Sequence, residues 1–334
     1  MKKKKMLEAG AKRSTTTGGG GAADEKAEAT ATPPLLSRSP SPPAMKRSQP
    51  TDTGALSVHD RMEAIAAAVD ARAADVTAQL ARRGFFVVDG LLGDATAAAL
   101  REEAEALQRL GFMVPSQSTR WNAEVGQVEA YEKHNVLSMQ LEGGELQYGV
   151  APRLVEYTAT LTQSLAPRVA AAFPDAAPLN ESVQTNKLAV CLGDGSAYDK
   201  HIDNQGGDDR RKLTVLYYMN DYGGSAAGGV KGEGGGYREA GRSVSEREAA
   251  WAASGCGGAF RAFCDPSDPE AYEDVAPIAD RLFGFWSDAL VHAVMPSQVR
   301  RPGSADHRFA LTVWLCVDDP CFIAFDPPNE AAHF

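Results

Sequence analysis

The segment YDKHIDN places a histidine and an aspartate two positions apart. In an extended chain, side chains at positions i and i+2 leave on the same face, so His201 and Asp203 would point one way, with Asp199 beside them. Lys200 and Ile202 would point the other way. A histidine and a carboxylate on one face could bind a metal ion, form a catalytic dyad or be a surface pair, and this tripeptide alone leaves all three open.

A second histidine beside this pair would complete two histidines and one carboxylate, the usual ligand set of non-haem Fe(II) oxygenases. The chain has six histidines. His59 begins a predicted helix, His333 lies near the end of the chain, and His134 lies in a polar segment upstream of the predicted strands. Of the other two, His292 is the better candidate, because it follows the strand-like segment RLFGFW in a turn-like region that could bring it back over that strand. His307 opens the next strand-like segment.

That segment, HRFALTVW, alternates between two faces. The face that begins with His307 is otherwise apolar, which indicates packing. The opposite face carries Arg308, Thr312 and Trp314, which supply a guanidinium group, a hydroxyl and an indole. Because arginine binds carboxylates bidentately and a hydroxyl adds a hydrogen bond, this face suits a buried carboxylate.

The composition limits the class of protein and its partners. The 334 residues could form one large domain or two small ones, and 43% hydrophobic with 23% charged residues is typical of a globular protein. The net charge of −10 argues against nucleic acid as the main partner, and the absence of a long apolar run argues against a membrane span. The five cysteines have no C-x-x-C spacing, which favours a reducing compartment, the cytoplasm, the nucleus or both.

The chain divides by composition into a tail and a folded domain. Residues 1–55 are rich in Gly, Ser, Thr and Pro and contain ten Lys/Arg and five Asp/Glu, so we predict a basic, disordered tail. Its MKKKK start has no apolar segment behind it and is not a secretory signal; a nuclear address and a solvated tail both remain open. Residues 56–334 would form the domain, interrupted at 222–258 by a glycine-rich loop insertion without a phosphate-binding motif.

The elements expected within 56–334 are helices first and short strands afterwards. We predict a helix over about 58–82 that ends at Gly84, a buried strand FFVVDGLL, a helix capped by Asp94 and stopped by Gly111, and further helix over 150–172. After residue 184 the runs are short and β-like. This order predicts an antiparallel β-barrel or sandwich with helices packed outside.

The ordered series YDKHIDN, LTVLYYMND, GGAFRAF, RLFGFWSD and HRFALTVW resembles the 2-oxoglutarate- and Fe(II)-dependent prolyl hydroxylases, most of all the oxygen-sensing, hypoxia-inducible-factor type. The resemblance runs from about residue 80 to about 318. It implies a mainly β fold with flanking helices, in which a double-stranded β-helix (jelly-roll) core spans about 184–318. The site residues that it implies are His201, Asp203 and His292 as iron ligands and catalytic residues, and Arg308, Tyr218 and Thr312 as contacts of 2-oxoglutarate.

The same resemblance implies a dioxygenase that uses Fe(II), with 2-oxoglutarate and O₂ as cosubstrates and L-ascorbate as a further cofactor. It would hydroxylate a prolyl residue of a protein or peptide and release succinate and CO₂. The alternatives are the same chemistry on a free amino acid or another side chain, and a β-helix binding module without turnover.

The chain departs from the family in four places, the first of which is the glycine-rich insertion at 222–258, where the family has a short connection. Leu192 stands where the family often has a tyrosine close to the cofactor. Arg308 follows His292 by sixteen positions, because the loop that contains Arg300 and Arg301 is enlarged. The substrate-selecting loops, expected around 112–135, match no motif.

Overall fold

The computed structural model describes residues 56–122, 126–222, 242–265, 268, 270–301 and 303–324. These residues all belong to the unit Gly54–Phe334. The predicted basic tail, the segment 223–241 of the predicted glycine-rich insertion, and His333 lie outside the described residues.

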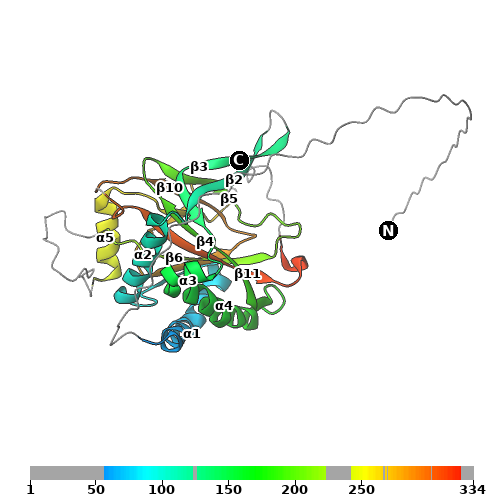
Figure 1. Ribbon diagram of the computed structural model, residues 1–334. Coiled ribbons are helices and arrows are strands. Elements are labelled where there is room, and N and C mark those ends of the chain that lie inside the picture. The colour runs from blue at the N-terminus through cyan, green and yellow to red at the C-terminus, as the bar shows by residue number, and fades with distance from the viewer. Residues whose placement is uncertain are drawn as a thin grey trace, which may run out of the picture. The chain divides into compact units, whose positions relative to one another are not determined.

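The centre of the fold is a pair of antiparallel sheets (Figure 1). Across the larger sheet the strands are β1 (Phe85–Asp89), β9 (Arg281–Trp286), β6 (Arg211–Tyr218), β11 (Arg308–Val317), β4 (Leu179–Cys191), β3 (Gln127–Met139) and β2 (Val114–Asn122). Across the smaller sheet they are β5 (Ser196–His201), β10 (Val291–Ser297), β7 (Phe260–Phe263) and β8 (Tyr272–Val275). The prediction of a jelly-roll core with flanking helices is confirmed.

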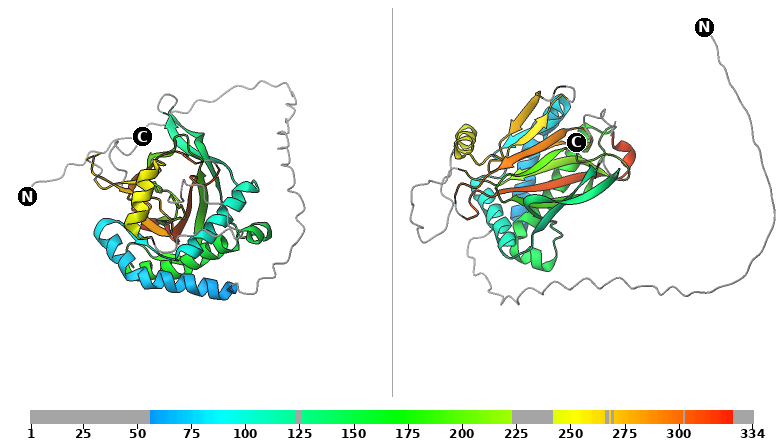
Figure 2. Two further views of the ribbon diagram at one scale, coloured as in Figure 1. Left: turned by 90° about the vertical axis from the view of Figure 1, so that its left-hand side faces the viewer. Right: turned by 90° about the horizontal axis from the view of Figure 1, so that it is seen from above.

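Helices cover one side of the larger sheet. They are α1 (Val58–Arg83), α2 (Asp94–Arg109), α3 (Glu145–Val150) and α4 (Pro152–Ala172), while α5 (Val244–Ser254) lies apart from them, and the described chain closes with the 3-10 turn η1 (Pro320–Phe322). Figure 2 shows α1, α2 and α4 gathered on the same side of the strands. The apolar stripe of α1 is buried in the main core against α4 and the sheet, as a surface helix of a globular protein requires.

The predicted helix ends are partly right. Gly84 ends α1 in the left-handed conformation (φ 76°), as predicted. The prediction that Asp94 caps α2 is wrong, because Gly93 occupies the cap position and makes no side-chain hydrogen bond. Asp94 is the first residue of the helix, and its carboxylate accepts a hydrogen bond from Arg247 of α5 instead.

Three segments have more regular structure than the sequence suggested. The expected loops around 112–135 are largely the two long strands β2 and β3, paired as a hairpin. The end of the predicted 222–258 loop is the helix α5, which has a capping box at Ser243. His292 lies in strand β10 and not in a turn, because the turn that follows β9 is finished at Leu290.

The two faces of β11 differ as predicted. Phe309, Leu311 and Val313 are completely buried in the main core between the larger sheet and its helices. Arg308, Ala310, Thr312 and Trp314 face the opposite way and line a cavity. The strand thus joins the hydrophobic core to a polar site through its alternation alone.

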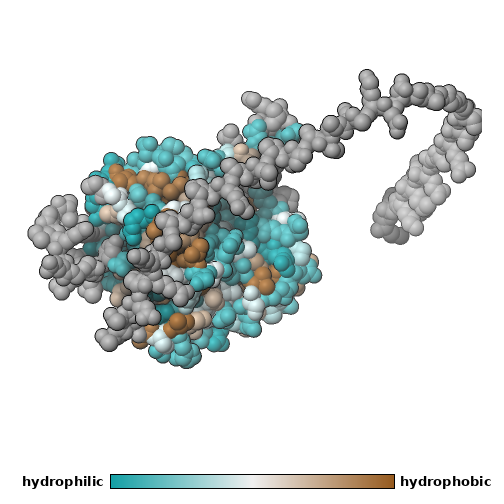
Figure 3. Space-filling model, in the orientation of Figure 1, coloured by the Kyte–Doolittle hydropathy of each residue, from teal (hydrophilic) through white to brown (hydrophobic). Residues whose placement is uncertain are grey.

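The surface seen in Figure 3 is mostly hydrophilic, and its hydrophobic residues form separate small patches. Within the ranges that the structure describes, no helix combines the length and apolarity needed to cross a membrane.

Candidate active site

A cavity of about 1370 Å³ is lined by residues of both sheets and by the β2–β3 hairpin. At one position in its wall lie His201, Asp203 and His292, whose potential ligand atoms are all within 4.8 Å of one another. Within the described part of the chain, these three residues form the one group of three or more His, Cys, Asp or Glu side chains that could hold a metal ion together. The three predicted iron ligands are therefore brought together.

Strand pairing explains how residues so far apart in the sequence meet. His201, the last residue of β5, pairs directly with His292 of β10, and their ring centroids are 4.2 Å apart. Asp203 follows β5 after one buried residue, Ile202. Its Oδ1 lies 3.3 Å from Nε2 of His201 and 3.6 Å from Nε2 of His292. The donor atoms of the three side chains thus converge on one point.

Both imidazole rings are held by their other nitrogen. Nδ1 of His201 lies 2.6 Å from the carbonyl oxygen of Asp199, and Nδ1 of His292 lies 3.0 Å from that of Leu290. Since a carbonyl only accepts hydrogen bonds, each Nδ1 carries the proton and donates it. The lone pair of each Nε2 is therefore directed toward Asp203, which is the arrangement that metal-binding histidines adopt.

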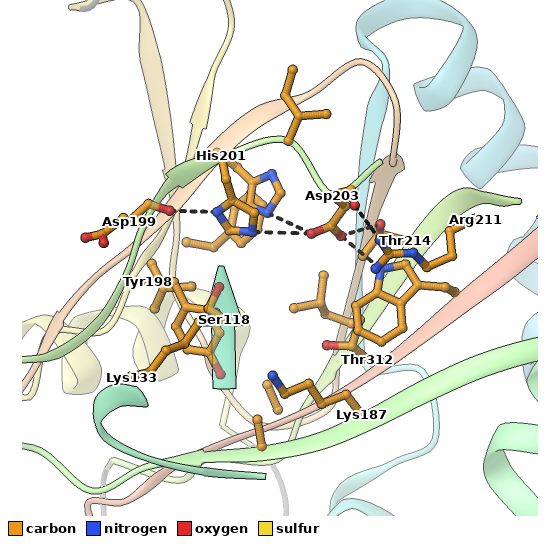
Figure 4. Close-up of a pocket in the computed structure, with 18 of the residues that line it drawn as sticks. Ser118, Lys133, Lys187, Tyr198, Asp199, His201, Asp203, Arg211, Thr214 and Thr312 are labelled. Atoms are coloured by element: carbon orange, nitrogen blue, oxygen red, sulfur yellow. Dashed lines mark hydrogen bonds and ion pairs between the residues drawn. The ribbon is translucent and has the colours of Figure 1, made fainter. Parts of the chain in front are cut away.

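Asp203 is oriented in the same way (Figure 4). Its Oδ2 accepts hydrogen bonds from Oγ1 of Thr214 (2.7 Å) and Nε1 of Trp314 (3.0 Å), which leaves Oδ1 for the histidines. Arg211 donates to its backbone carbonyl at 2.7 Å. Burial on its own would raise the pKa of Asp203, but the neighbouring His201 and His292 and the hydrogen bond from Trp314 hold the pKa well below its usual range. The carboxylate is thus ionised and ready to bind a cation.

This donor set fits Fe(II). Burial, together with the neighbouring His201, lowers the pKa of His292 to about 3, so its ring is neutral at physiological pH. Two imidazoles and one carboxylate are the ligands that non-haem iron(II) enzymes use, and His201, Asp203 and His292, which would hold the ion, all line the cavity.

Arg308 lines the same cavity and is only 4% exposed. Its Nε donates to the carbonyl oxygen of Gly258 (2.7 Å), and Nη2 lies 3.4 Å from the hydroxyl of Tyr218. A Cβ at position 258 would come within 2.7 Å of Cδ of Arg308, so the glycine makes room for this side chain. None of the described residues provides a carboxylate for Arg308, so its charge is left for an anionic ligand such as 2-oxoglutarate.

Of the other two predicted contacts of 2-oxoglutarate, Thr312 lines the cavity and Tyr218 does not. Thr312 lines the cavity two positions along the strand from Ala310, whereas Tyr218 is fully buried beside Arg308 and contacts its guanidinium. Arg301 of the enlarged loop is paired with Asp306 at 2.6 Å. Asp306 also accepts hydrogen bonds from the backbone N–H groups of Arg300 and Arg301, so this loop is ordered by its own carboxylate.

Several residues of the site were missed by the sequence analysis. Tyr198 lines the cavity, while Leu192, the position of the expected tyrosine, packs against the main core. Lys133, Lys187 and Thr214 line it too. The alternation of side chains along β3, β4 and β6 places each of these residues on one face of its strand. Which face lines the cavity depends on the neighbouring strands, and these could not be identified from the sequence.

The part of the chain that contains the three proposed metal ligands matches a known protein family. Residues 186–316 match the 2OG-Fe(II) oxygenase superfamily. Over 133 residues, 39% of this chain and 40% of the relative, it is 32% identical to mouse "Prolyl hydroxylase EGLN3". Over 128 residues, 38% of this chain and 12% of the relative, it is 33% identical to the Caenorhabditis elegans "Hypoxia-inducible factor prolyl hydroxylase". The chain therefore spans less than half the length of these relatives.

Solved structures show the same fold. A Phytophthora capsici prolyl 4-hydroxylase superposes with a TM-score of 0.52 at 23% identity, over 84% of this chain and 70% of that one. A Pseudomonas putida prolyl-4-hydroxylase superposes with a TM-score of 0.50 at 20% identity, over 74% of this chain and all of that one. With a jelly-roll fold, a converging His–Asp–His cluster and a matching family profile, this chain contains a 2OG-Fe(II) oxygenase domain.

Proposed function

We propose that this protein hydroxylates a prolyl residue of a protein or peptide, using Fe(II), 2-oxoglutarate and O₂ and releasing succinate and CO₂. The observation that carries the proposal is the convergence of His201, Asp203 and His292 in a cavity that also contains the guanidinium of Arg308, which has no carboxylate partner among the described residues. These groups answer the two needs of the reaction, a site for the metal and an anchor for the dicarboxylate.

Each residue has one task in this proposal. His201, Asp203 and His292 would hold the iron, and the hydrogen bonds on their outer atoms keep the donor atoms in place before metal arrives. Arg308 would bind the distal carboxylate of 2-oxoglutarate, with Thr312 in the same wall. When bound, the iron and 2-oxoglutarate supply the oxidation of a substrate C–H bond to C–OH.

The apolar part of the wall would exclude water from the reacting groups. Phe260 stacks on His292 with ring centroids 4.9 Å apart, and Phe285 lies 4.6 Å from the same ring. Val294 and Leu216 line the cavity beside them. A dry wall next to the metal ligands lowers the local dielectric and protects a reactive site from side reactions.

The size of the cavity favours a peptide substrate over a free amino acid, and the relatives of this chain are named as prolyl hydroxylases. A volume of about 1370 Å³ exceeds what 2-oxoglutarate and a single amino acid need, since pockets for small ligands are roughly 300–1,000 Å³. One wall is formed by the β2–β3 hairpin, through Gln117, Ser118 and Tyr131. An extended peptide could lie along such a wall.

The test begins with binding in the absence of oxygen. The full chain is titrated with Fe(II) and then with 2-oxoglutarate, after which O₂ and proline-containing peptides are admitted. We expect succinate release that depends on peptide, together with a mass gain of one oxygen atom on proline. Binding of both iron and 2-oxoglutarate without any peptide-dependent succinate would contradict prolyl hydroxylation, and failure to bind iron would contradict the oxygenase assignment altogether.

A further inference from the structure

Two lysines in the cavity have no task in the reaction as proposed. Lys133 of β3 and Lys187 of β4 line it near Tyr198 (Figure 4). Nζ of Lys133 lies 3.7 Å from the centroid of that ring, and Nζ of Lys187 lies 5.9 Å from it. Both amino groups therefore share one small region of the wall.

Neither amino group is neutralised by the residues that the structure describes. Lys187 donates to Oγ of Ser116 (2.8 Å), a neutral partner, and Lys133 contacts the face of Tyr198. Across the described chain, no carboxylate forms an ion pair with either of them. Burial and the nearby Lys187 lower the pKa of Lys133 to about 7, and burial lowers that of Lys187, which agrees with a shortage of negative charge in this region.

The charges of the proposed reaction do not supply what is missing. The carboxylate that acts most favourably on both lysines is that of Asp203, whose charge would be taken up by the metal. One carboxylate of 2-oxoglutarate would bind Arg308, and the other would bind the iron together with the keto group. Two buried amino groups with no counter-charge among the described residues call for a third carboxylate, which would also favour their protonated forms.

From this arrangement we infer that Lys133 and Lys187 bind an acidic side chain of the peptide substrate, so that the enzyme selects prolyl residues with aspartate or glutamate close by. The inference rests on the proposed function and adds its substrate class. Tyr198 lies close to both amino groups and, because burial raises its pKa, keeps its hydroxyl protonated as a further donor. The carboxylate would then accept charge-assisted hydrogen bonds from two sides.

The experiment uses the full chain, loaded with Fe(II) and 2-oxoglutarate without oxygen, and short fluorescent peptides with one proline. Each peptide pair carries glutamate or glutamine at one flanking position, and fluorescence anisotropy gives the two dissociation constants. At one or two positions we expect the glutamate peptide to bind about tenfold more tightly, the contribution of one charge-assisted hydrogen bond. A ratio near one at every position would overturn the inference without any variant.

Variants then assign the preference to the lysines. Lys133→Met combined with Lys187→Met should reduce the glutamate-to-glutamine ratio to less than about twofold, while Arg109→Met, which removes an exposed charge on α2, should leave it unchanged. Thermal unfolding checks that the variants are folded. If the double variant instead loses affinity for 2-oxoglutarate and keeps the peptide ratio, the lysines serve the cosubstrate and the inference is wrong.

Three further outcomes separate this inference from the proposed function. Displacement of the labelled peptide by free glutamate as effectively as by the glutamate peptide would assign the lysines to a small acid and overturn the peptide class. Hydroxylation of proline in all peptides alike, read by mass, would leave the proposed function standing and remove the acidic preference. Peptide binding that depends on glutamate, without any proline hydroxylation, would support the role of the lysines and contradict the proposed function.

Discussion

Two buried arginines on the larger sheet meet opposite surroundings. Arg281 of β9 is 3% exposed and is paired with Asp89 (2.7 and 3.0 Å) and Glu248 (2.7 Å). Arg308 of β11 is 4% exposed, yet its partners are one carbonyl group and one phenol. Burying a charge is costly unless a counter-charge lies beside it. The charge of Arg281 is compensated within the protein, whereas that of Arg308 would be compensated by an anionic ligand.

Two aspartates, the buried Asp280 and the partly buried Asp203, show the same contrast. Asp280 accepts hydrogen bonds from the backbone N–H groups of Leu92 and Gly93 and from the hydroxyl of Tyr217, so both of its oxygens are used. Asp203 has one oxygen held by Thr214 and Trp314, while the other faces the two histidines. The hydrogen bonds of Asp280 thus connect elements of the fold, whereas the carboxylate oxygen of Asp203 that faces the two histidines is placed to bind a metal ion.

The most severe test of this contrast is to remove a proposed metal ligand. His292→Ala should lower Fe(II) affinity by more than about 100-fold, because two side chains no longer define one face of the coordination sphere. Equilibrium dialysis with Fe(II) under anaerobic conditions measures the change. His307→Ala is the control: iron lost there and retained in His292→Ala would mean that the third ligand has been chosen wrongly.

The same substitution at the two arginines should have opposite effects on stability. Arg281→Met should lower the free energy of unfolding by about 2–3 kcal/mol, since Asp89 and Glu248 lose their partner but are themselves partly exposed. Arg308→Met should leave the free energy of unfolding unchanged or raise it, because it removes an unneutralised buried charge. Urea denaturation of both variants gives the comparison, and equal losses would refute it.

A conservative change at Arg308 tests the cosubstrate contact directly. Arg308→Lys keeps the charge but loses the planar fork, so the apparent KM for 2-oxoglutarate should rise by about 10–150-fold while iron binding is retained. Steady-state kinetics and iron titration together measure this. The controls are Arg300→Lys and Arg301→Lys; a large rise there with none at position 308 would place the contact in the loop.

The smallest effect is expected at the residues that orient Asp203. Trp314→Phe removes the indole donor to Oδ2 but leaves that of Thr214, so Fe(II) affinity should fall by about tenfold. Trp251→Phe removes an indole hydrogen bond to Gly257 outside the site and should not change it. Unaltered iron affinity in Trp314→Phe would show that Thr214 alone orients the carboxylate.

Local signals predicted much of the fold. The length of α1 and its end at Gly84 follow from helix propensity and a left-handed glycine, and the two faces of β11 follow from alternation. The prediction failed where long-range contacts decide. The polar segment around 112–135 forms strands because β3 pairs with both β2 and β4, and Asp94 leaves its expected cap for Arg247 of a distant helix.

By itself, the sequence determined which residues can do chemistry: the His–Asp pair of YDKHIDN, a later histidine, and an arginine on the polar face of a strand. These depend on residue type and on the two-residue period of a strand, which are local properties. Only the tertiary structure decided that β5 pairs with β10 so that His201 meets His292, and that Arg308 lies without a carboxylate partner from the described residues. Register and charge balance arise between segments distant in the chain, and no local pattern encodes them.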